Sequence, residues 1–217
     1  MSQASPKYNR TPHLPWSPGA TNDDRIMKNV ATLLGKPLIA TEKMDGSNIC
    51  LERNNVFARS HNQAPNHPSF DALKAVHASV QYKIPDGVQV FGEWLYARHS
   101  IAYDALSNWL QIFAVRDGDI WWSWEDVGLM SVELEIPRVT QIGFATVQTE
   151  KELQKWVENC VAVTPAAGKE KEGVVVRHCA NFINEHFERC VAKWVRANHV
   201  QTDDHWKSQM VVVNGVR

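Results

Sequence analysis

The sequence predicts an α+β fold in which helices flank antiparallel sheet. Short strand-forming runs alternate with a smaller number of helical segments, and turns rich in Gly, Asp and Pro join most of them. The 217 residues are 44% hydrophobic and include nine Trp, which is enough for one domain with a substantial core. We therefore expect a main domain over residues 26–217, preceded by an irregular strap over residues 1–25.

The strap is expected because this segment is rich in Pro, Ser and Asn, with Leu14 and Trp16 as the apolar residues that would fix it to the domain. Residues 22–24 (Asn-Asp-Asp) are of the types that cap helices. We expect a helix from there to about Leu34, ended by the Gly and Pro that follow.

The elements of the main domain follow from apolar runs, caps and turn residues. Helices are expected to begin near Phe70, Ser123 and Thr149. The Asp45-Gly46 turn signal joins the first two strand-forming runs, so we expect a hairpin-like unit with Lys43 at its mouth. The strand-forming runs are 37–41, 49–53, 88–94, 110–115, 120–122, 174–176 and 191–195.

Composition restricts the class of function. The net charge of −1 gives no global basic field, so any nucleic-acid partner would need a local basic surface. Four Cys without CxxC spacing are typical of reduced thiols in a cytoplasmic protein. The N-terminus lacks an apolar signal region, no run is long enough to span a membrane, and we expect no membrane partner. The Gly-rich phosphate loops of P-loop ATPases and kinases are absent.

The stretch Thr41–Asn48 carries the strongest functional signal. It places Lys43 between the carboxylates of Glu42 and Asp45 at the edge of a predicted strand, which makes the lysine a candidate nucleophile. The Lys-x-Asp-Gly pattern is weak alone, because a solvated lysine in a polar turn is the commoner interpretation of such a short pattern. The motifs that follow it in the sequence decide between these alternatives.

Five further groups follow in order: Ala58-Arg59-Ser60, Phe91–Leu95, Gln111–Val115, Glu172–Arg177 and Val191–Val195. Most combine a short strand with a polar residue of the kind that a nucleotide site requires. Together with Lys43-Met44-Asp45-Gly46, they resemble the collinear motifs of the covalent nucleotidyltransferase superfamily, which comprises RNA ligases, DNA ligases and mRNA capping enzymes. The resemblance extends from about Pro37 to about Val195 and is strongest to ATP-dependent RNA ligases of the phage RNA-ligase-2-like group.

The resemblance implies the nucleotidyltransferase (adenylyltransferase) fold in a single domain, with a nucleotide pocket between two sheets. It also implies ATP and Mg²⁺ (or Mn²⁺) as cofactors. The residue roles that it implies are adenylylation for Lys43, contact with adenine for Glu42, contact with ribose for Arg59 and Glu93, stacking on adenine for Phe113, metal association for Glu172, a place near the α-phosphate for Lys193, and RNA joining for Asn48.

Adenylyl transfer to lysine sets a requirement that the sequence leaves open. The attacking amine must be neutral, yet the pKa of a free lysine is about 10.4. Burial and nearby positive charge, from Lys193, Arg59 or a divalent cation, lower such a pKa. The carboxylates of Glu42 and Asp45 would oppose that shift, unless they face the metal or other hydrogen-bond donors.

The candidate residues also have ordinary structural alternatives. Taken from the residues alone, Phe113 is a core ring, Arg59 a surface arginine, Glu93 half of a salt bridge, and Glu172 a solvated residue before a strand. Lys193 could equally be a lysine at a sheet edge. Their roles in nucleotide transfer therefore depend on the resemblance.

The sequence departs from the family pattern near its end. Many relatives carry two lysines in the last motif, whereas here Lys193 is followed by Arg196, which a strand would direct to the face opposite Val195. Residues 196–217 are too few for the additional domain of larger ligases, so we expect a compact, single-domain RNA ligase. Two His in the tail after Asn198 leave open a metal site or, more commonly, solvated side chains.

The leading hypothesis is an ATP-dependent RNA ligase that acts on RNA with 5′-phosphate and 3′-hydroxyl ends. A DNA ligase ranks lower and a GTP-using capping enzyme lower still, because neither the size nor the motifs suggest the extra domains of those enzymes. The alternative from another class is a non-catalytic protein of the same fold that binds nucleotide or RNA ends. The combined presence of Lys, Glu, Arg and Asn motif residues argues against such a decayed site.

Overall fold

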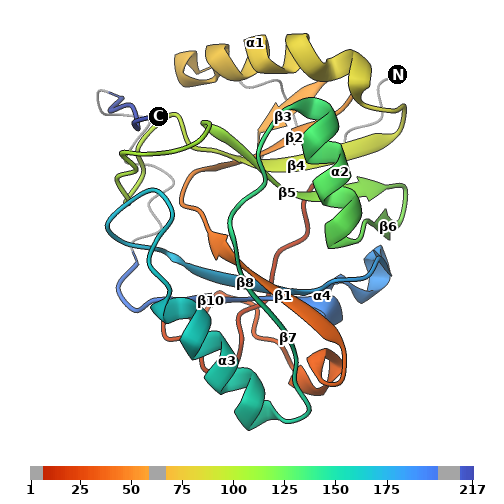
Figure 1. Ribbon diagram of the computed structural model, residues 1–217, viewed down its shortest axis with the longest axis vertical. Coiled ribbons are helices and arrows are strands. Elements are labelled where there is room, and N and C mark those ends of the chain that lie inside the picture. Colours follow the sequence, from red (N-terminus) through yellow and green to blue (C-terminus); the bar gives the residue numbers. More distant parts are fainter. Residues whose placement is uncertain (1–6, 59–66, 200–210) are drawn as a thin grey trace.

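Two antiparallel sheets lie one above the other, with helices on their outer faces, in the computed structural model of the chain (Figure 1). The structure describes residues 7–58, 67–199 and 211–217. One sheet has the strand order β10-β8-β1-β7 and the other β3-β2-β4-β5-β6-β9, and all paired strands run antiparallel. The expected α+β class is confirmed. The strands are β1 (Pro37–Lys43), β2 (Ser47–Leu51), β3 (Val56–Ala58), β4 (Val88–Trp94), β5 (Leu110–Asp117), β6 (Ile120–Trp121), β7 (Gln141–Thr146), β8 (Gly173–His178), β9 (Phe182–Ile183) and β10 (Val191–Val195).

The three longer helices cover the outer faces of the sheets. In Figure 1, α1 and α2 lie against the six-stranded sheet and α3 lies against the four-stranded sheet. The Thr149 hydroxyl caps α3 by accepting from the Glu152 amide, as the sequence predicts. No helix in the described ranges combines the length and apolar content needed to cross a bilayer. The helices are α1 (Asp71–Val80), α2 (Trp124–Leu134), α3 (Glu150–Ala162) and α4 (Phe187–Cys190), and the 3₁₀ helices are η1 (Val30–Leu33), η2 (Pro68–Phe70), η3 (Gln81–Lys83) and η4 (Asn184–His186).

The core consists of three apolar clusters. The largest lies between the six-stranded sheet and helices α1 and α2, and a second lies between the four-stranded sheet and α3. The third lies between the two sheets, where Phe91 and Trp121 of one sheet meet Val191 of the other. Glu93 lies two residues after Phe91 on β4, so its side chain is on the same face of the strand. The space between the sheets therefore changes from apolar to charged within two residues of a strand.

The first two strands do not form the hairpin-like unit that the sequence suggests. β1 belongs to the four-stranded sheet and β2 to the six-stranded sheet, so Asp45-Gly46 carries the chain from one sheet to the other. Gly46 passes so close to β4 that a Cβ on it would lie 2.6 Å from the carbonyl oxygen of Trp94. Lys43 stands at the end of its strand, as expected, but beside the crossing between sheets.

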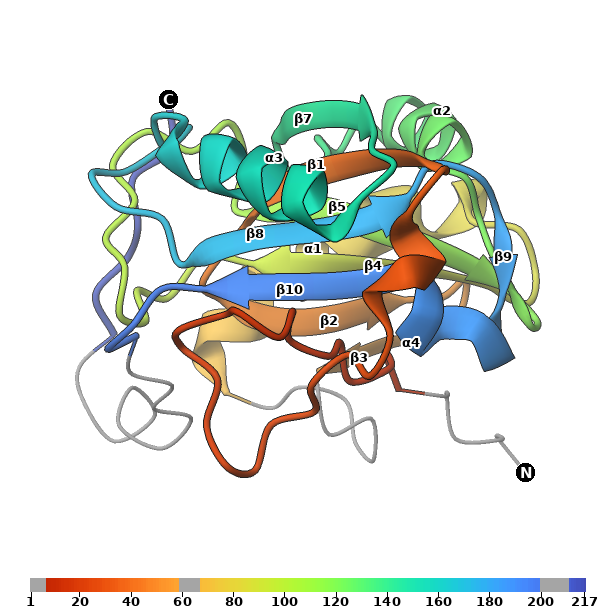
Figure 2. The ribbon, with the colours of Figure 1, turned by 90° about the horizontal axis from the view of Figure 1, so that it is seen from below.

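The N-terminal segment runs along β10 (Figure 2). The amide of Leu14 donates to the carbonyl of Lys193, and the amide of Lys193 donates to Pro12. The predicted helix up to Leu34 is wrong, because only residues Val30–Leu33 form a 3₁₀ helix, which Asn29 caps. The Met27 amide donates instead to His13, and this long-range pairing replaces helical hydrogen bonds.

Candidate active site

Lys43 lies at the end of β1 and contacts Glu172, the residue that precedes β8. Its Nζ is 2.7 Å from Oε2 of Glu172, whose side chain is only 3% exposed, while the Lys43 side chain is 25% exposed. Register places Lys43 opposite Gly173. A Cβ on Gly173 would overlap the carbonyl oxygen of Trp194, so glycine allows β8 to fit between its two neighbours.

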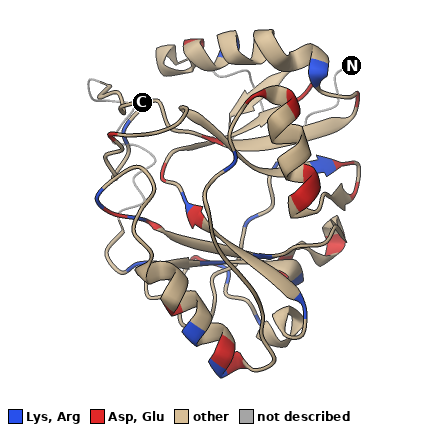
Figure 3. Ribbon diagram, viewed as in Figure 1, with Lys and Arg blue, Asp and Glu red and all other residues tan. Residues whose placement is uncertain are grey.

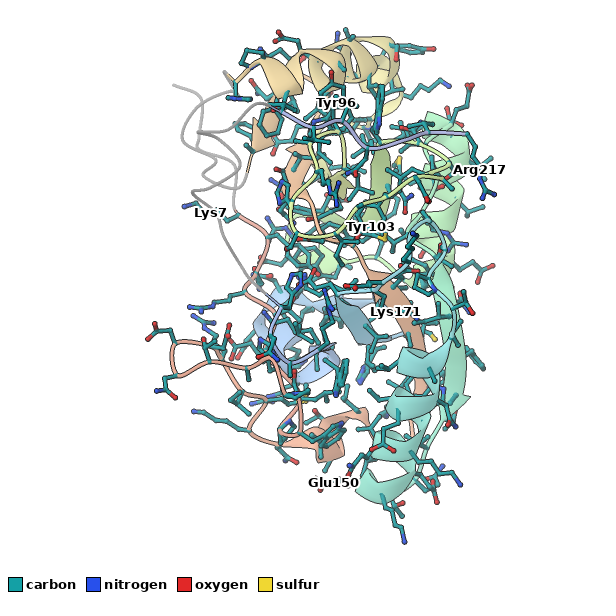
Figure 4. The ribbon with its side chains drawn as sticks, turned by 90° about the vertical axis from the view of Figure 1, so that its left-hand side faces the viewer. Lys7, Tyr96, Tyr103, Glu150, Lys171 and Arg217 are labelled. Carbon is teal, nitrogen blue, oxygen red and sulfur yellow. The ribbon has the colours of Figure 1, made fainter. Side chains whose placement is uncertain are left out.

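Asp45 is held in the crossing between the sheets by a loop that precedes β5. Its Oδ2 accepts from the amide and hydroxyl of Ser100 at 2.8 and 2.9 Å and from the amide of Ile101 at 2.9 Å. Its own amide donates to the hydroxyl of Tyr103, which lies between the two sheets in Figure 4. Burial acts to raise the pKa of Asp45, but nearby His199 and the hydrogen bonds from Ile101 and Ser100 outweigh it and lower the pKa to about 2.

His199 joins Asp45 to Glu172 from the segment that follows β10. Its Nε2 lies 3.7 Å from Asp45 Oδ1 and 3.4 Å from Glu172 Oε1, and its side chain is only 2% exposed. The ordinary interpretation of the tail histidines as solvated is therefore wrong for His199. His205, the other tail histidine, lies outside the described residues.

Glu93 and Asn48 face this group from the six-stranded sheet. They stand opposite each other on β4 and β2, and the Gly46 amide donates to Glu93 Oε1 at 3.1 Å. Burial raises the pKa of Glu93 to about 8, although the charge of Lys43 opposes the shift. The Glu93 carboxyl therefore keeps its proton to a higher pH than a solvated glutamate does.

The described surroundings of Lys43 do not supply the lowered pKa that a nucleophile needs. Burial acts to lower the pKa of Lys43, but the charges of Glu172, Glu93 and Asp45 outweigh burial and raise it. In this state the amine is an ammonium ion paired with Glu172. The requirement for a neutral amine must be met by something that binds to the carboxylates.

Lys193 stands on β10 opposite Val175, one strand away from β1. Its Nζ lies 3.8 Å from Asp24 Oδ1, and Asp24 also faces His13 at 3.5 Å. Burial and the charge of Lys43 lower the pKa of Lys193, although Asp24 acts against them. The nearby Arg196, which follows the motif, pairs with Glu170 at 2.7 Å.

Residues 36–195 match the RNA ligase family. The chain belongs to this family. A comparison with curated proteins found no match. Among solved structures, the chain is similar to an archaeal ATP-dependent RNA ligase (12% identity, TM-score 0.56), a Naegleria gruberi RNA ligase with pyrophosphate (12%, 0.53) and a putative ATP-dependent DNA ligase from Aquifex aeolicus (15%, 0.52).

Each of these alignments covers 88% of this member of the RNA ligase family, but only 48%, 61% and 50%, respectively, of the solved chains. The chain thus spans between about half and three fifths of the length of these ligases. At such low identity the likeness establishes the fold alone, and it agrees with the expected nucleotidyltransferase fold. The phage RNA-ligase-2-like subgroup remains a prediction.

The structure of this RNA ligase family member brings several predicted residues together. Lys43 and Glu172 are in contact, and Glu93 and Lys193 are close enough to influence the pKa of Lys43 or to be influenced by its charge. Asn48 is adjacent to Glu93 by register. These placements are consistent with the predicted roles but do not test them.

Two predicted residues do not join this group. Glu42 is the neighbour of Lys43 on β1 and points to the opposite face, where its Oε2 accepts from the Ala166 amide at 3.0 Å. Phe113 lies on β5 with its ring meeting Tyr8 edge-on at 5.0 Å. Arg59 lies outside the described residues.

Sequence reasoning gave no site role to Asp24, and for Asp45 and the tail histidines it left contact with a metal only as an open alternative. Asp45 belongs to the Lys-x-Asp-Gly pattern, so a local signal for it existed. His199 faces Asp45 and Glu172, and Asp24 faces Lys193; both come from segments that carry no family motif, and only the tertiary structure places them there. Elsewhere, charges of both signs are spread over the ribbon, and α3 carries both (Figure 3).

Proposed function

We propose that this chain is an ATP-dependent RNA ligase, which adenylylates itself on Lys43, transfers AMP to a 5′-phosphate RNA end and seals that end to a 3′-hydroxyl. The observation that carries the proposal is the contact between Lys43 and the buried Glu172 beside Asp45 and Glu93, in a member of the RNA ligase family. A lysine fixed among buried carboxylates is suited to nucleotide chemistry that uses a divalent cation.

In the first step, neutral Lys43 Nζ attacks the α-phosphorus of ATP. A nitrogen–phosphorus bond forms, the bond between the α-phosphorus and its bridging oxygen breaks, and pyrophosphate leaves while the new phosphoramidate nitrogen releases its extra proton to pyrophosphate or water. The ammonium proton that Lys43 first loses has an acceptor in Glu172 Oε2, 2.7 Å away. Lys193 supplies positive charge for the α-phosphate, a role that its compact ammonium group suits.

In the second step, a 5′-phosphate oxygen of RNA attacks the adenylyl phosphorus, and the bond to Lys43 breaks. In the third step, a 3′-hydroxyl attacks the 5′-phosphorus, its proton leaves, and AMP is released. Asn48, beside Glu93 on the neighbouring strand, is the residue that we assign to these RNA-joining steps.

The donor set fits a divalent cation. Asp45 Oδ1 and Glu172 Oε1 face one another across His199, and their partner oxygens accept hydrogen bonds or the Lys43 ion pair. Carboxylate oxygens suit Mg²⁺ and Mn²⁺. When bound there, the cation would supply positive charge that opposes the raised pKa of Lys43 and neutralises the triphosphate.

The test is mass spectrometry of the protein mixed with ATP and Mg²⁺, kept out of acid to preserve the phosphorus–nitrogen bond. We expect a gain of one AMP in the wild-type chain and none in Lys43→Ala. Sealing of 5′-phosphorylated RNA, with Lys74→Ala on the exposed face of α1 as the matched control, tests the later steps. Wild-type protein that gains no AMP and seals no pre-adenylylated RNA would contradict the proposal.

The similarity to a solved DNA ligase supports a second candidate. Parallel assays with nicks that differ only in RNA or DNA strands separate the two ligases. Label from GTP instead of ATP would indicate a capping enzyme. Binding of ATP or RNA ends without any covalent adduct would favour a non-catalytic protein of the same fold.

A further inference from the structure

His199 is a buried imidazole in a segment that the family match does not cover. The match ends at residue 195, four residues before His199. The His199 side chain is 2% exposed, and its Nε2 faces Asp45 Oδ1 and Glu172 Oε1. Its other ring nitrogen, Nδ1, is buried without a hydrogen-bond partner among the described residues. The two carboxylates are therefore the polar groups toward which this ring is directed.

Each of the two carboxylates has one oxygen that faces the imidazole and one that is bound elsewhere. Asp45 Oδ2 accepts the three hydrogen bonds from Ser100 and Ile101, and Glu172 Oε2 accepts from Lys43. Those bonds hold both groups in place and leave Asp45 Oδ1 and Glu172 Oε1 pointing to His199 Nε2. The arrangement resembles a ligand set whose members are fixed by separate supporting contacts.

The spacing fits one cation. The three atoms lie within 4.8 Å of one another, and two of their separations are 3.4 and 3.7 Å. A cation with bonds of about 2.1 Å requires its donors to lie about 3.0 to 4.2 Å apart, according to the angle between the bonds. The separations of 3.4 and 3.7 Å from His199 Nε2 lie within this range.

The charges of the group also favour a cation. Asp45 and Glu172 bring two carboxylates to the site, and the ammonium group of Lys43 pairs directly with Glu172. Both carboxylates are buried, and buried carboxylates need cationic or hydrogen-bonding partners. A divalent cation between them and the imidazole would be such a partner.

We propose that His199 Nε2, Asp45 Oδ1 and Glu172 Oε1 together bind one divalent cation, and that the imidazole ligand makes this site prefer Mn²⁺ to Mg²⁺. Imidazole nitrogen is a better ligand for first-row transition ions than for Mg²⁺, which prefers oxygen. His199 is thus a cation ligand and a determinant of metal specificity. The inference rests on the proposed function in one respect, namely that Glu172 serves a cation.

Pulsed electron paramagnetic resonance of Mn²⁺ bound to the full chain, without nucleotide, tests the ligand directly. We expect nitrogen coupling from a bound imidazole in the wild-type protein and its loss in His199→Gln. The ratio of the Mg²⁺ to the Mn²⁺ dissociation constant should fall at least fivefold in His199→Gln. His186→Ala, which removes an exposed histidine on η4, should keep both the coupling and the ratio.

The outcomes separate this inference from the proposed function. Mn²⁺ bound to the wild-type chain without nitrogen coupling overturns the inference, whatever the folding of the variant, and identifies His199 as an ion-pair partner of the carboxylates. Formation of the AMP adduct in the same preparations is a separate measurement. Nitrogen coupling without any AMP adduct supports the cation site and contradicts the proposed ligase function. An AMP adduct without nitrogen coupling supports the ligase function and contradicts His199 as a cation ligand.

Discussion

Lys43 and Lys193 stand on strands that flank β8 on either side, yet their surroundings have opposite effects on their amines. Burial acts to lower the pKa of both. Around Lys43 the charges of Glu172, Glu93 and Asp45 reverse that effect and raise the pKa. Around Lys193 the charge of Lys43 adds to burial, Asp24 and Glu172 offset only part of it, and the pKa is lowered. Because burial acts in the same direction on both amines, the charged neighbours account for the difference between them.

This difference separates two properties that a nucleophile needs. Lys193 has the amine that loses its proton more readily, but Lys43 has the family motif and the group of carboxylates that fits a cation. If binding of that cation is what frees Lys43, the protein keeps its nucleophile protonated until the cofactors arrive. Each experiment below tests one consequence of this contrast.

The largest effect is expected from Lys43→Arg. Arginine keeps the positive charge and the ion pair with Glu172 but stays protonated at any workable pH, so it cannot attack phosphorus. We expect the rate of AMP adduct formation to fall by at least about 10³-fold. Peptide mapping of the wild-type adduct should locate AMP on Lys43. AMP on Lys193 would reverse the roles assigned to the two lysines.

Lys193→Ala should have the next largest effect. Removing a cation that stabilises charge in the transition state typically costs about 10²-fold in rate. Lys193→Arg should recover part of that loss, because the guanidinium restores the charge without being a nucleophile. Adduct formation is measured with saturating ATP, and Lys74→Arg on α1 is the control. Equal rates for Lys193→Ala and the wild-type chain would remove Lys193 from the chemistry.

The strands and the helix caps were accessible from sequence because they depend on local patterns. Val88–Trp94 appears with the expected bounds, and α3 begins where Thr149 predicts. The sheet to which each strand belongs was not accessible, and the expected hairpin at Asp45-Gly46 is instead a crossing between sheets. The crossing depends on the close approach of Gly46 to β4, and no local sequence pattern predicts such a long-range contact.

The residues of the candidate site also fall into those that sequence motifs predicted and those that they did not. Lys43 and Glu172 come from motifs, and the structure places them in contact. Asp24 and His199 come from segments without motifs, and their positions result from long-range packing. The predicted helix before Leu34 failed for the same reason, because the Met27 amide pairs with His13, fourteen residues earlier in the chain.

Glu93→Gln tests the carboxylate surroundings of Lys43 through stability. The pKa of Glu93 is raised from its ordinary value of 4.5 to about 8, so the folded chain keeps a proton that the unfolded chain loses as pH rises through this range. The free energy of unfolding should therefore fall between pH 4.5 and 8. Gln cannot ionise and keeps the acceptor for the Gly46 amide.

We expect Glu93→Gln to exceed the wild-type chain in stability by on the order of 5 kcal/mol at pH 9 and by little at pH 4.5, because the pKa of Glu93 rises from 4.5 to about 8 and each pKa unit corresponds to about 1.4 kcal/mol. Urea unfolding at the two pH values measures the difference. A gain that is the same at both would mean that Glu93 titrates normally.

Competitive acylation compares the two amines in a single sample. With limiting acetic anhydride at pH 8 and no nucleotide, the amine with the lower pKa reacts faster, by about tenfold for each unit of difference. Lys193 should therefore be labelled before Lys43, as read by peptide mass spectrometry. Exposure acts against this expectation, because the Lys193 side chain is 13% exposed and that of Lys43 is 25% exposed. Faster labelling of Lys193 can then be attributed to charge and not to access.

Two additions make the labelling experiment sharper. Mn²⁺ should increase the labelling of Lys43, since a cation at Glu172 and Asp45 opposes the charges that raise the Lys43 pKa. Asp24→Asn should increase the labelling of Lys193 by less than about threefold. It removes one negative charge, 3.8 Å from Lys193 Nζ, that acts to raise the pKa of this lysine. If Lys43 is labelled first without any cation, the carboxylates do not hold it protonated, and the contrast between the two lysines is lost.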